Sequence, residues 1–233
     1  MTRFQTSLLF TAAACVAGVG LLYAQTKQAA APLAQAQFAA SKEWPTYGHD
    51  SGGMRHSPLT EITPANVTNL EIAWTYHMKP ATPVAAPATP PAGATGRGRG
   101  RGLTGGTGFA QSETTPIVID GRMFITTPYG RIVALDPATG AVCADFGDGT
   151  GQINLWEGMP HARVGGYYAT SPPAIAGDRL IVGGTVLDNV STRQPSGVIR
   201  AYDVHTGRLL WNWDPGRPND TSPLPPGQTY VES

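Results

Sequence analysis

Short runs of alternating apolar and polar residues, separated by turn residues, fill the second half of the chain. Thr115–Asp120, Arg122–Thr127 and Arg131–Asp136 are three such runs, rich in β-branched side chains. Runs of this kind, bounded by Gly, Pro and Asp, are typical of β-strands, and the Asp-Gly between the first two favours a tight hairpin turn. A Pro-Ala-Thr-Gly turn then leads to Ala141–Phe146, which we expect to be a fourth strand. The pattern predicts a four-stranded antiparallel meander.

The same pattern occurs a second time. Arg131–Gly140 and Val198–Gly207 each consist of an apolar run that ends in Asp, then two variable residues and Thr-Gly. The residues from Ser171 to Val182 match the first two strands of the first copy, and the extra residues of the second copy fall in one loop, Thr185–Ser196. A repeat decides the fold class before other signals do. An insertion confined to one loop leaves the sheet intact and adds a place where binding residues are common.

Successive four-stranded meanders with an aromatic residue near each fourth strand are typical of the blades of a β-propeller. Trp211 has this position in the second copy, and Trp74 has it if Asn69–Tyr76 is the last strand of an earlier blade. Thr63 followed by Pro64 predicts a short helix before that strand. We therefore expect an all-β chain with two full blades and part of another. A small sandwich built of meanders is the alternative.

The N-terminus has the features of an export signal. Arg3 precedes the uncharged apolar run Leu8–Leu22, which is short for a membrane span of ~20 residues. We predict a signal peptide over residues 1–24 and hence a periplasmic protein. An uncleaved anchor or a lipid on Cys15 is the alternative, and either would add membrane association.

Two stretches show neither a helical nor a strand pattern. Residues 25–42 are rich in Ala and Gln and are expected to form a flexible leader. Residues 79–108 are rich in Pro and Ala and end in an Arg-Gly tract, a composition that buries too little apolar surface to order itself. We interpret this stretch as a disordered insertion. An Arg-Gly tract can bind RNA, but export and a net charge of zero argue against a nucleic-acid partner.

Composition supports many short strands joined by turns, because 29 Gly and 21 Pro occur among 233 residues and only 14% are charged. Once a signal peptide is removed, Cys143 is the one cysteine left, which is unusual in an exported protein. It is either a small buried apolar residue or a cysteine whose partner lies in sequence that this chain lacks. His49, His56, His161 and His205 do not have metal-ligand spacing and are expected on surface turns.

These motifs carry a family resemblance. The sequence Ala-x-Asp-x-x-Thr-Gly-x-x-x-Trp at Ala201–Trp211 resembles the repeat of quinoprotein dehydrogenases that use pyrroloquinoline quinone; in the first copy Ala144 replaces the Trp. Trp44–Asp50 and Arg55–Leu59 are similar to the N-terminal motif of that family. The resemblance covers residues 43–78, with this motif, the short helix and a closing strand, and the blades at 109–217, leaving 218–233 as a tail.

Two segments resemble the membrane-bound glucose dehydrogenase branch of the family in particular. Gly183–Arg200 and Ala144–Pro160 resemble sequences of that branch. The resemblance implies an eight-bladed propeller in which the quinone lies across the central channel beside a divalent cation, Ca²⁺ or Mg²⁺. It also implies oxidation of an alcohol or of an aldose such as glucose, with hydride passing to the quinone and electrons to a respiratory quinone or cytochrome. The protein supplies orientation and electrostatics for this chemistry.

The resemblance assigns roles to four residues. Glu113 matches a quinone-contacting Glu, and Thr170 matches a Thr that hydrogen-bonds the quinone. Asp188 and Asn189 lie in the extra loop, where the family has a metal ligand, and their oxygens suit a hard cation. Each has a structural alternative: Glu113 as a solvated charge at a strand start, Thr170 as a turn cap, and Asp188-Asn189 as an ordinary turn dipeptide.

The chain also departs from the family pattern. The Thr-Gly turn at Gly140 runs directly into Cys143–Gly147, as if two repeats had been fused and the sequence between them lost. The family continues for several more blades, so its catalytic Asp base is expected beyond Ser233 and no catalytic residue is assigned here. Because a blade buries its faces only against neighbours, we expect an N-terminal portion that is inactive alone. A non-enzymatic periplasmic scaffold with similar repeats is the alternative.

Overall fold

The computed structural model describes residues 43–50, 52–80, 114–162, 166–186 and 193–232. The chain divides into two compact units. Gly48–Leu59 belongs to the first, and Glu43–Tyr47 with Thr60–Ser233 form the second, which holds every strand found in the described ranges. The predicted signal peptide, the leader and nearly all of the predicted insertion lie outside the described residues.

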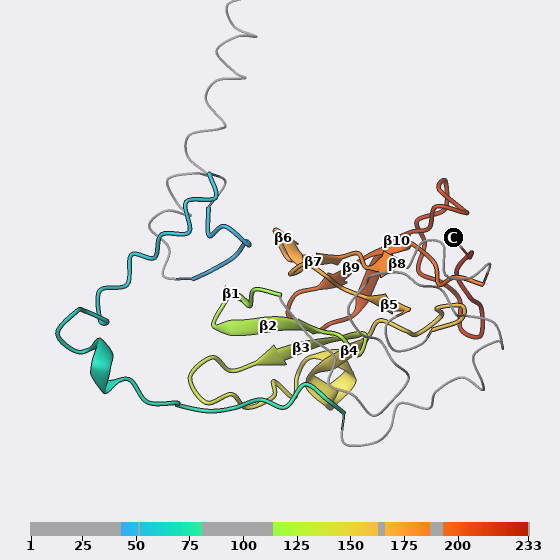
Figure 1. Cartoon of the computed structure of the whole chain (residues 1–233). Coiled ribbons are helices and arrows are strands. Elements are labelled where there is room, and N and C mark those ends of the chain that lie inside the picture. The colour runs from blue at the N-terminus through green and yellow to red at the C-terminus, as the bar shows by residue number, and fades with distance from the viewer. Residues whose placement is uncertain (1–42, 51, 81–113, 163–165, 187–192, 233) are drawn as a thin grey trace, which may run out of the picture. The chain divides into compact units, whose positions relative to one another are not determined.

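The first sheet contains β1 (Ile117–Ile119), β2 (Arg122–Thr127), β3 (Arg131–Leu135) and β4 (Gln152–Asn154) (Figure 1). The strands pair antiparallel in the order β1-β2-β3-β4. Asp120 and Gly121 join β1 to β2 with φ angles of 50° and 70°, the left-handed conformation that an Asp-Gly hairpin turn requires. The first three strands are therefore confirmed.

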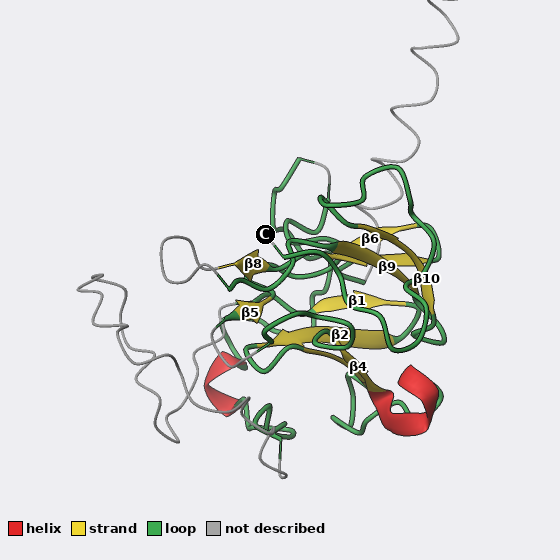
Figure 2. Ribbon diagram, turned by 90° about the vertical axis from the view of Figure 1, so that its right-hand side faces the viewer, coloured by secondary structure: helices red, strands yellow, loops and turns green. Residues whose placement is uncertain are grey.

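The second sheet contains β6 (Ala174–Ala176), β7 (Arg179–Val182), β9 (Ile199–Asp203) and β10 (Leu209–Trp213), in the antiparallel order β10-β9-β7-β6. This is the predicted second meander. Between β7 and β9 the chain forms β8 (Thr185–Val186), which pairs with β5 (Tyr167–Tyr168) in a separate two-stranded sheet (Figure 2). The extra loop thus adds structure outside the main sheet, as its position suggested.

The prediction of a fourth strand at Ala141–Phe146 is wrong. Only Val142 forms a bridge, to Leu135, and the chain then leaves the sheet in a short helical turn, η2 (Gly147–Gly151). Asp148 and three glycines of this turn have positive φ angles between 54° and 84°, which no strand accommodates. The chain returns to the sheet at β4, beside the other end of β3.

The stretch before the first sheet is also different from the prediction. The short helix is present as the single turn η1 (Val67–Asn69), but Asn69–Tyr76 forms no strand. Leu70 and Ile72 are 58% and 86% exposed, so their apolar alternation has no sheet to face among the described residues. Trp74 of this stretch contacts the first copy of the repeat, donating from Nε1 to the carbonyl of Pro137 at 3.0 Å.

One apolar core joins the two main sheets. The ribbon shows the sheets stacked one above the other (Figure 2), and their facing side chains form a contiguous cluster. Its largest wholly buried members are Phe124, Ile132, Phe146, Leu155, Tyr167, Leu180 and Val198. The sheets therefore stabilise each other by burying apolar surface at their shared face.

Hydrogen bonds within each Asp-x-x-Thr-Gly turn hold its conformation. In the second copy, the Asp203 carboxylate accepts hydrogen bonds from His205 N, Thr206 N and Thr206 Oγ1 at 3.1, 2.8 and 2.8 Å. Asp136 accepts equivalent bonds from Ala138 N and Thr139 N. The backbone N–H of Thr206 holds the pKa of Asp203 below its usual range. The motif is thus a self-contained turn, and its Gly has the left-handed conformation.

An aromatic ring covers each of these turns. A Cβ at Gly140 would lie 2.5 Å from the indole of Trp74, and one at Gly207 would lie 3.2 Å from the ring of Phe146 and 2.8 Å from the Gly147 nitrogen. Gly147 N–H also donates to the Thr206 carbonyl at 2.9 Å. In each copy, therefore, the chain that precedes the copy packs on its Thr-Gly turn, and only Gly leaves enough space.

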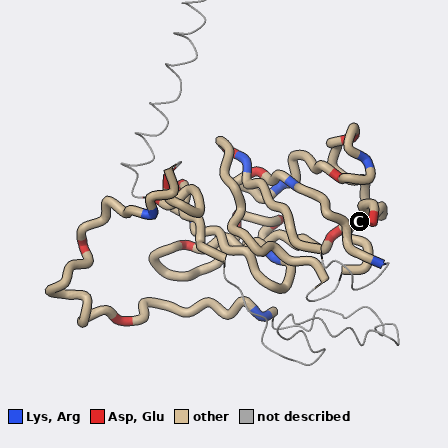
Figure 3. Tube along the Cα trace, turned by 45° about the horizontal axis from the view of Figure 1, so that its top comes forward, with Lys and Arg blue, Asp and Glu red and all other residues tan. Residues whose placement is uncertain are grey.

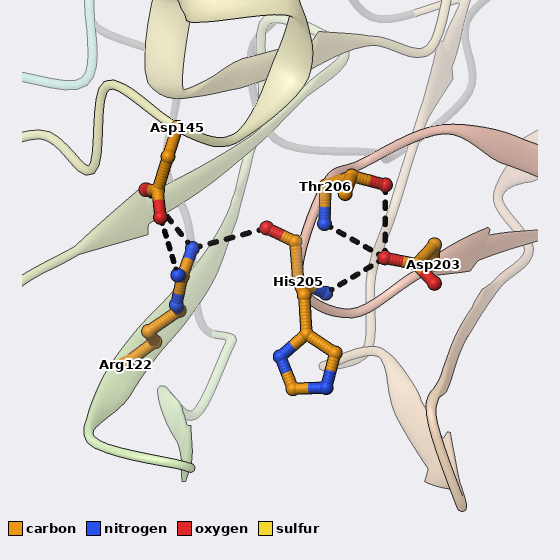
Figure 4. A network of polar contacts seen from close by, with 5 residues as sticks. All are labelled: Arg122, Asp145, Asp203, His205 and Thr206. Atoms are coloured by element: carbon orange, nitrogen blue, oxygen red, sulfur yellow. Dashed lines mark hydrogen bonds and ion pairs between the residues drawn. The ribbon is translucent and has the colours of Figure 1, made fainter.

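An exposed polar network reinforces the contact between the two sheets (Figure 4). The Arg122 guanidinium makes a two-pronged ion pair with Asp145, at 3.1 and 2.6 Å, and also donates to the His205 carbonyl at 3.1 Å. The hydrogen bond from Arg122 lowers the pKa of Asp145. Arg122 belongs to β2, so this network ties the first sheet to the turn that Asp203 organises.

Two minor predictions can be compared with the structure. His56 and His205 are exposed as expected, but His49 is 1% exposed, so the prediction of a surface position is wrong for it. Cys143 is half-buried against the core, and burial raises the pKa of its thiol, as for a small apolar residue. No helix in the described part of the chain is long and apolar enough to cross a membrane.

Candidate cofactor-binding site

Thr170 is the predicted site residue that the structure describes; Glu113, Asp188 and Asn189 lie outside the described residues. Thr170 follows β5 after one residue and leads, through Ser171 and two prolines, into β6. Its side chain is exposed, so its hydroxyl is accessible to a ligand. The roles of all four residues therefore remain predictions.

The two copies have equivalent approaches to their first strands. Thr114 precedes Thr115-Pro116 in the first copy, and Thr170 precedes Ser171-Pro172 in the second. Each hydroxyl-bearing residue lies directly before the sheet to which it leads. Glu113 is the residue immediately before Thr114 in the sequence and lies outside the described residues.

These two approaches meet at one buried residue, Thr126. The Thr114 hydroxyl donates to the Thr126 carbonyl at 3.0 Å. The Thr126 hydroxyl in turn donates to the Ser171 carbonyl at 3.4 Å. Thr126 is fully buried near the end of β2. The structure therefore brings the sequence neighbours of both predicted quinone contacts, Glu113 and Thr170, to the same strand end.

The β5 strand that leads to Thr170 is held firmly. Trp156 donates from Nε1 to the Tyr167 carbonyl at 3.0 Å, and its indole packs on Gly130, where a Cβ would lie 2.3 Å from Nε1. The Tyr167 ring lies against Gly184, where a Cβ would lie 2.4 Å from the ring. Both rings therefore occupy space that only glycine leaves free, and they pack tightly around the strand that leads to Thr170.

A buried arginine supports the same strand. Arg200 of β9 is 1% exposed, and its Nη2 donates to the Leu155 carbonyl at 2.6 Å. Its guanidinium lies 5.9 Å from the ring centre of Tyr167 and 5.6 Å from that of Tyr230. Burial raises the pKa of the neighbouring Tyr202 above its ordinary value, so that hydroxyl stays neutral beside the cation. Arg200 thus connects β9, the loop after β4, β5 and the C-terminal segment.

The carboxylate of Asp214 has structural partners. Asp214 is buried, and its oxygens accept from Gly216 N at 3.1 Å and Val231 N at 2.9 Å, with Arg217 at 3.5 Å. This arrangement is a turn and tail anchor, and it leaves Asp214 poorly placed to act as a base. Acidic and basic residues are scattered along the described trace (Figure 3), and within it no three His, Cys, Asp or Glu side chains cluster as metal ligands do.

Sequence reasoning did not find Thr126, Trp156 or Arg200. Thr126 resembles any strand residue, since Thr is a common β-former. Arg200 did have a signal, because a charged residue interrupts the apolar run of a strand that the repeat places inside the fold. Such a residue is buried only with hydrogen-bond or aromatic partners, and those partners come from distant parts of the chain.

Comparison with known families identifies the repeat. The sequence profile described as "Glucose/ethanol/alcohol dehydrogenase, beta-propeller domain", of the PQQ type, matches residues 44–142 and 138–233. The chain belongs to this family. The resemblance to quinoprotein dehydrogenases and the all-β propeller class of the two antiparallel sheets are thereby confirmed.

Curated relatives include several dehydrogenases. The chain is 32% identical to quinoprotein glucose dehydrogenase A of Acinetobacter calcoaceticus, covering 83% of this chain and 30% of that protein. It is 35% identical to the glycerol dehydrogenase large subunit of Gluconobacter oxydans, covering 81% and 30%. It is 31% identical to quinate/shikimate dehydrogenase (quinone) of Acinetobacter baylyi, covering 82% and 30%. The chain therefore spans about 30% of the length of these relatives.

The two matched segments meet within the first Thr-Gly turn, at residues 138–142. The alignment with the glucose dehydrogenase extends over 264 positions, more than the 233 residues of this chain. That relative therefore has residues, inside the aligned region, that this chain lacks. The junction at 138–142 is also the point after which the first sheet departs from the second, because the chain leaves the sheet after Val142.

Proposed function

We propose that this chain contributes part of the quinone site of a pyrroloquinoline-quinone-dependent dehydrogenase that oxidises an alcohol or sugar hydroxyl. The relatives are named for glucose, glycerol and quinate or shikimate, which supports a polyhydroxylated substrate. A respiratory quinone or a cytochrome is the proposed electron acceptor. Membership in the family supports the class of reaction, and the meeting of the two approaches at Thr126 is the structural observation that carries the proposal.

The residues present fit a planar, multiply charged quinone. The exposed Thr170 hydroxyl is a hydrogen-bond donor on a backbone fixed by Tyr167 and Trp156, and preorganised donors of this kind favour a charged ligand. We assign Glu113, which precedes Thr114, a second contact to the quinone. When bound, the quinone accepts the hydride of the substrate, and these residues hold its orientation.

A divalent cation beside the quinone belongs to the same proposal. We assign Asp188 and Asn189, in the loop that follows β8, as its ligands, since carboxylate and carboxamide oxygens suit Ca²⁺ or Mg²⁺. Export by a signal peptide over residues 1–24 to the periplasm is likewise proposed, because the substrate and acceptor chemistry suits that compartment. Membrane association would follow if the apolar segment is retained.

Co-elution of quinone with the protein tests this function. The purified chain is mixed with pyrroloquinoline quinone and Ca²⁺, passed through a gel-filtration column and monitored for quinone absorbance in the protein peak. We expect retention by the wild type and reduced retention by Thr170→Val, which removes the hydroxyl with little change of volume. Thr150→Val, on the exposed η2 turn, is the matched control and should retain the quinone. Absence of quinone from the wild-type peak would contradict the proposal and favour a non-enzymatic scaffold.

A further inference from the structure

We propose that Thr126 is a positioning residue that couples the two halves of the quinone site. This inference rests on the proposed function, because it concerns the approaches that carry Glu113 and Thr170. Thr126 is not expected to touch the quinone. It acts through Thr114 and Ser171, the residues that follow those two predicted contacts.

The position of Thr126 in the sheet explains why both approaches reach it. β1 pairs with β2 only as far as Phe124, the partner of Ile117. Past that pair, the edge of β2 extends beyond β1, and there the hydroxyl of Thr114 donates to the Thr126 carbonyl at 3.0 Å. Thr114 thereby continues the line of β1 with a side-chain bond in place of a backbone pair.

The side chain of Thr126 makes the second connection, toward the other sheet. Its hydroxyl donates to the carbonyl of Ser171 at 3.4 Å. Because Thr126 is fully buried, loss of this hydroxyl would leave the Ser171 carbonyl without that donor in a place that water reaches poorly. The bond therefore fixes the backbone directly after Thr170 relative to β2.

One residue thus connects three segments: the approach to the first sheet, the end of β2 and the approach to the second sheet. Two of these segments have an ordered element behind them, since β2 pairs with β3 over five residues and Trp156 donates to the Tyr167 carbonyl of β5. A ligand that contacts Glu113 and Thr170 needs a constant distance between them. Thr126 is the described residue that links both approaches by direct hydrogen bonds.

The neighbouring Thr127 provides a matched control. It is also buried, at 1% exposure, and is the next residue of the same strand. Its hydroxyl accepts from Tyr129 N and Arg131 N, both at 3.3 Å, and so serves the turn between β2 and β3. Val at either position keeps the shape and removes one buried hydroxyl. The two substitutions therefore separate a general loss of stability from a loss of coupling.

The experiment compares Thr126→Val, Thr126→Ser and Thr127→Val in the full chain. Amide hydrogen exchange is measured for peptides covering residues 114–118 and 168–172, and the affinity for pyrroloquinoline quinone with Ca²⁺ is measured by fluorescence quenching. We expect Thr126→Val to raise exchange in both peptides and to weaken quinone binding about fivefold, the effect of one ordinary hydrogen bond. Thr126→Ser should restore wild-type behaviour, and Thr127→Val should raise exchange only around residues 127–131.

The outcomes separate this inference from the proposed function. If the wild type does not bind quinone, the proposed function fails, and the exchange data still decide whether Thr126 couples the segments. Unchanged exchange in both peptides, or an equal change in Thr127→Val, overturns the coupling. Raised exchange with unaltered quinone affinity overturns the positioning role. If Thr126→Val does not fold, Thr114→Val at the half-buried end of the same connection must raise exchange in both peptides, or the inference is wrong.

Discussion

Replacement of Arg200 tests how the two sheets and the approach to Thr170 are held together. The guanidinium is buried, donates to the Leu155 carbonyl at 2.6 Å and lies over two tyrosine rings. No ion pair with a carboxylate accompanies it in the described parts of the chain. Its neighbours are therefore neutral, and removing its charge leaves no opposite charge buried and unpaired.

The size of the effect follows from this environment. Arg200→Met keeps much of the length and packing but leaves the Leu155 carbonyl without its donor, which costs about 1–3 kcal/mol. Arg200→Ala adds a cavity, so we expect a total of about 3–5 kcal/mol, by analogy with other large-to-small core substitutions. Arg200→Lys keeps a charge but replaces the planar fork with a compact, strongly hydrated ammonium. We therefore expect Lys to be less stable than Met.

Urea titration monitored by tryptophan fluorescence measures these differences, with the m-value as a check that unfolding remains comparable. Arg122→Met is the matched control, because its guanidinium also bridges two segments but its partner Asp145 is 67% exposed. An exposed pair of this kind contributes about 1 kcal/mol or less. An Arg200→Ala protein within about 0.5 kcal/mol of the wild type, or a Lys variant more stable than the Met variant, would refute the reasoning.

Three other predictions concern the contact between the sheets. Phe146→Ala should lower the free energy of unfolding by about 3–5 kcal/mol, because the ring is wholly buried between Phe124 and the Gly207 turn; a loss below about 1 kcal/mol in urea titration would contradict this packing. Gly207→Ala should cost at least about 1 kcal/mol by the same measurement, since φ is 75° and a Cβ would crowd Gly147, whereas Gly177→Ala meets no neighbour and serves as the control for φ alone. Asp203→Asn should flatten the acid dependence of the unfolding midpoint. The folded pKa of Asp203 is lowered, so its stabilisation is present above its unfolded pKa of about 3.9 and is lost as pH falls through the folded value; an unchanged acid profile would argue against that role.

Much of the fold could be predicted because the signals are local. Turns that contain Gly, among them the Asp-Gly and Thr-Gly turns, bound most of the strands, and their left-handed residues and Asp-capped hydrogen bonds depend on only a few neighbouring positions. The second sheet and the first three strands of the first sheet follow from these turns. The propeller class then follows from the repetition of the unit and not from any single residue.

The wrong predictions occur where contacts with residues far away in the sequence determine the local structure. Ala141–Phe146 alternates like a strand, but Phe146 is buried under the Gly207 turn and Asp145 pairs with Arg122, so the chain leaves the sheet to reach both. Asn69–Tyr76 also alternates, yet Trp74 packs on the Gly140 turn without a strand ladder around it. Periodicity indicates which faces are apolar, and it does not say whether a neighbouring strand is available.

The candidate site also contains residues that a local motif predicts and residues whose role depends on distant contacts. Thr170 was found through a motif, and its exposed position agrees with a ligand contact without testing it. Thr126 and Arg200 could not be found in this way, because their importance depends on which carbonyls they reach: Ser171 for one and Leu155 for the other. Their partners are far away in sequence, and nothing in the strand pattern identifies them. The residues that position a site are thus harder to predict than those that would touch its ligand.

The junction in the first copy explains how the chain keeps a continuous fold despite its departure from the family. The Trp of the repeat is replaced by Ala144, so the aromatic ring that should cover the next Thr-Gly turn is absent from its usual place. Phe146, two positions later, supplies the ring, and the left-handed η2 turn that follows brings the Gly147 N–H to the Thr206 carbonyl. β4 then resumes the pairing with β3. At this junction one ring, one glycine and one backbone bond thus connect the first sheet to the Thr-Gly turn of the second, in addition to the shared apolar core.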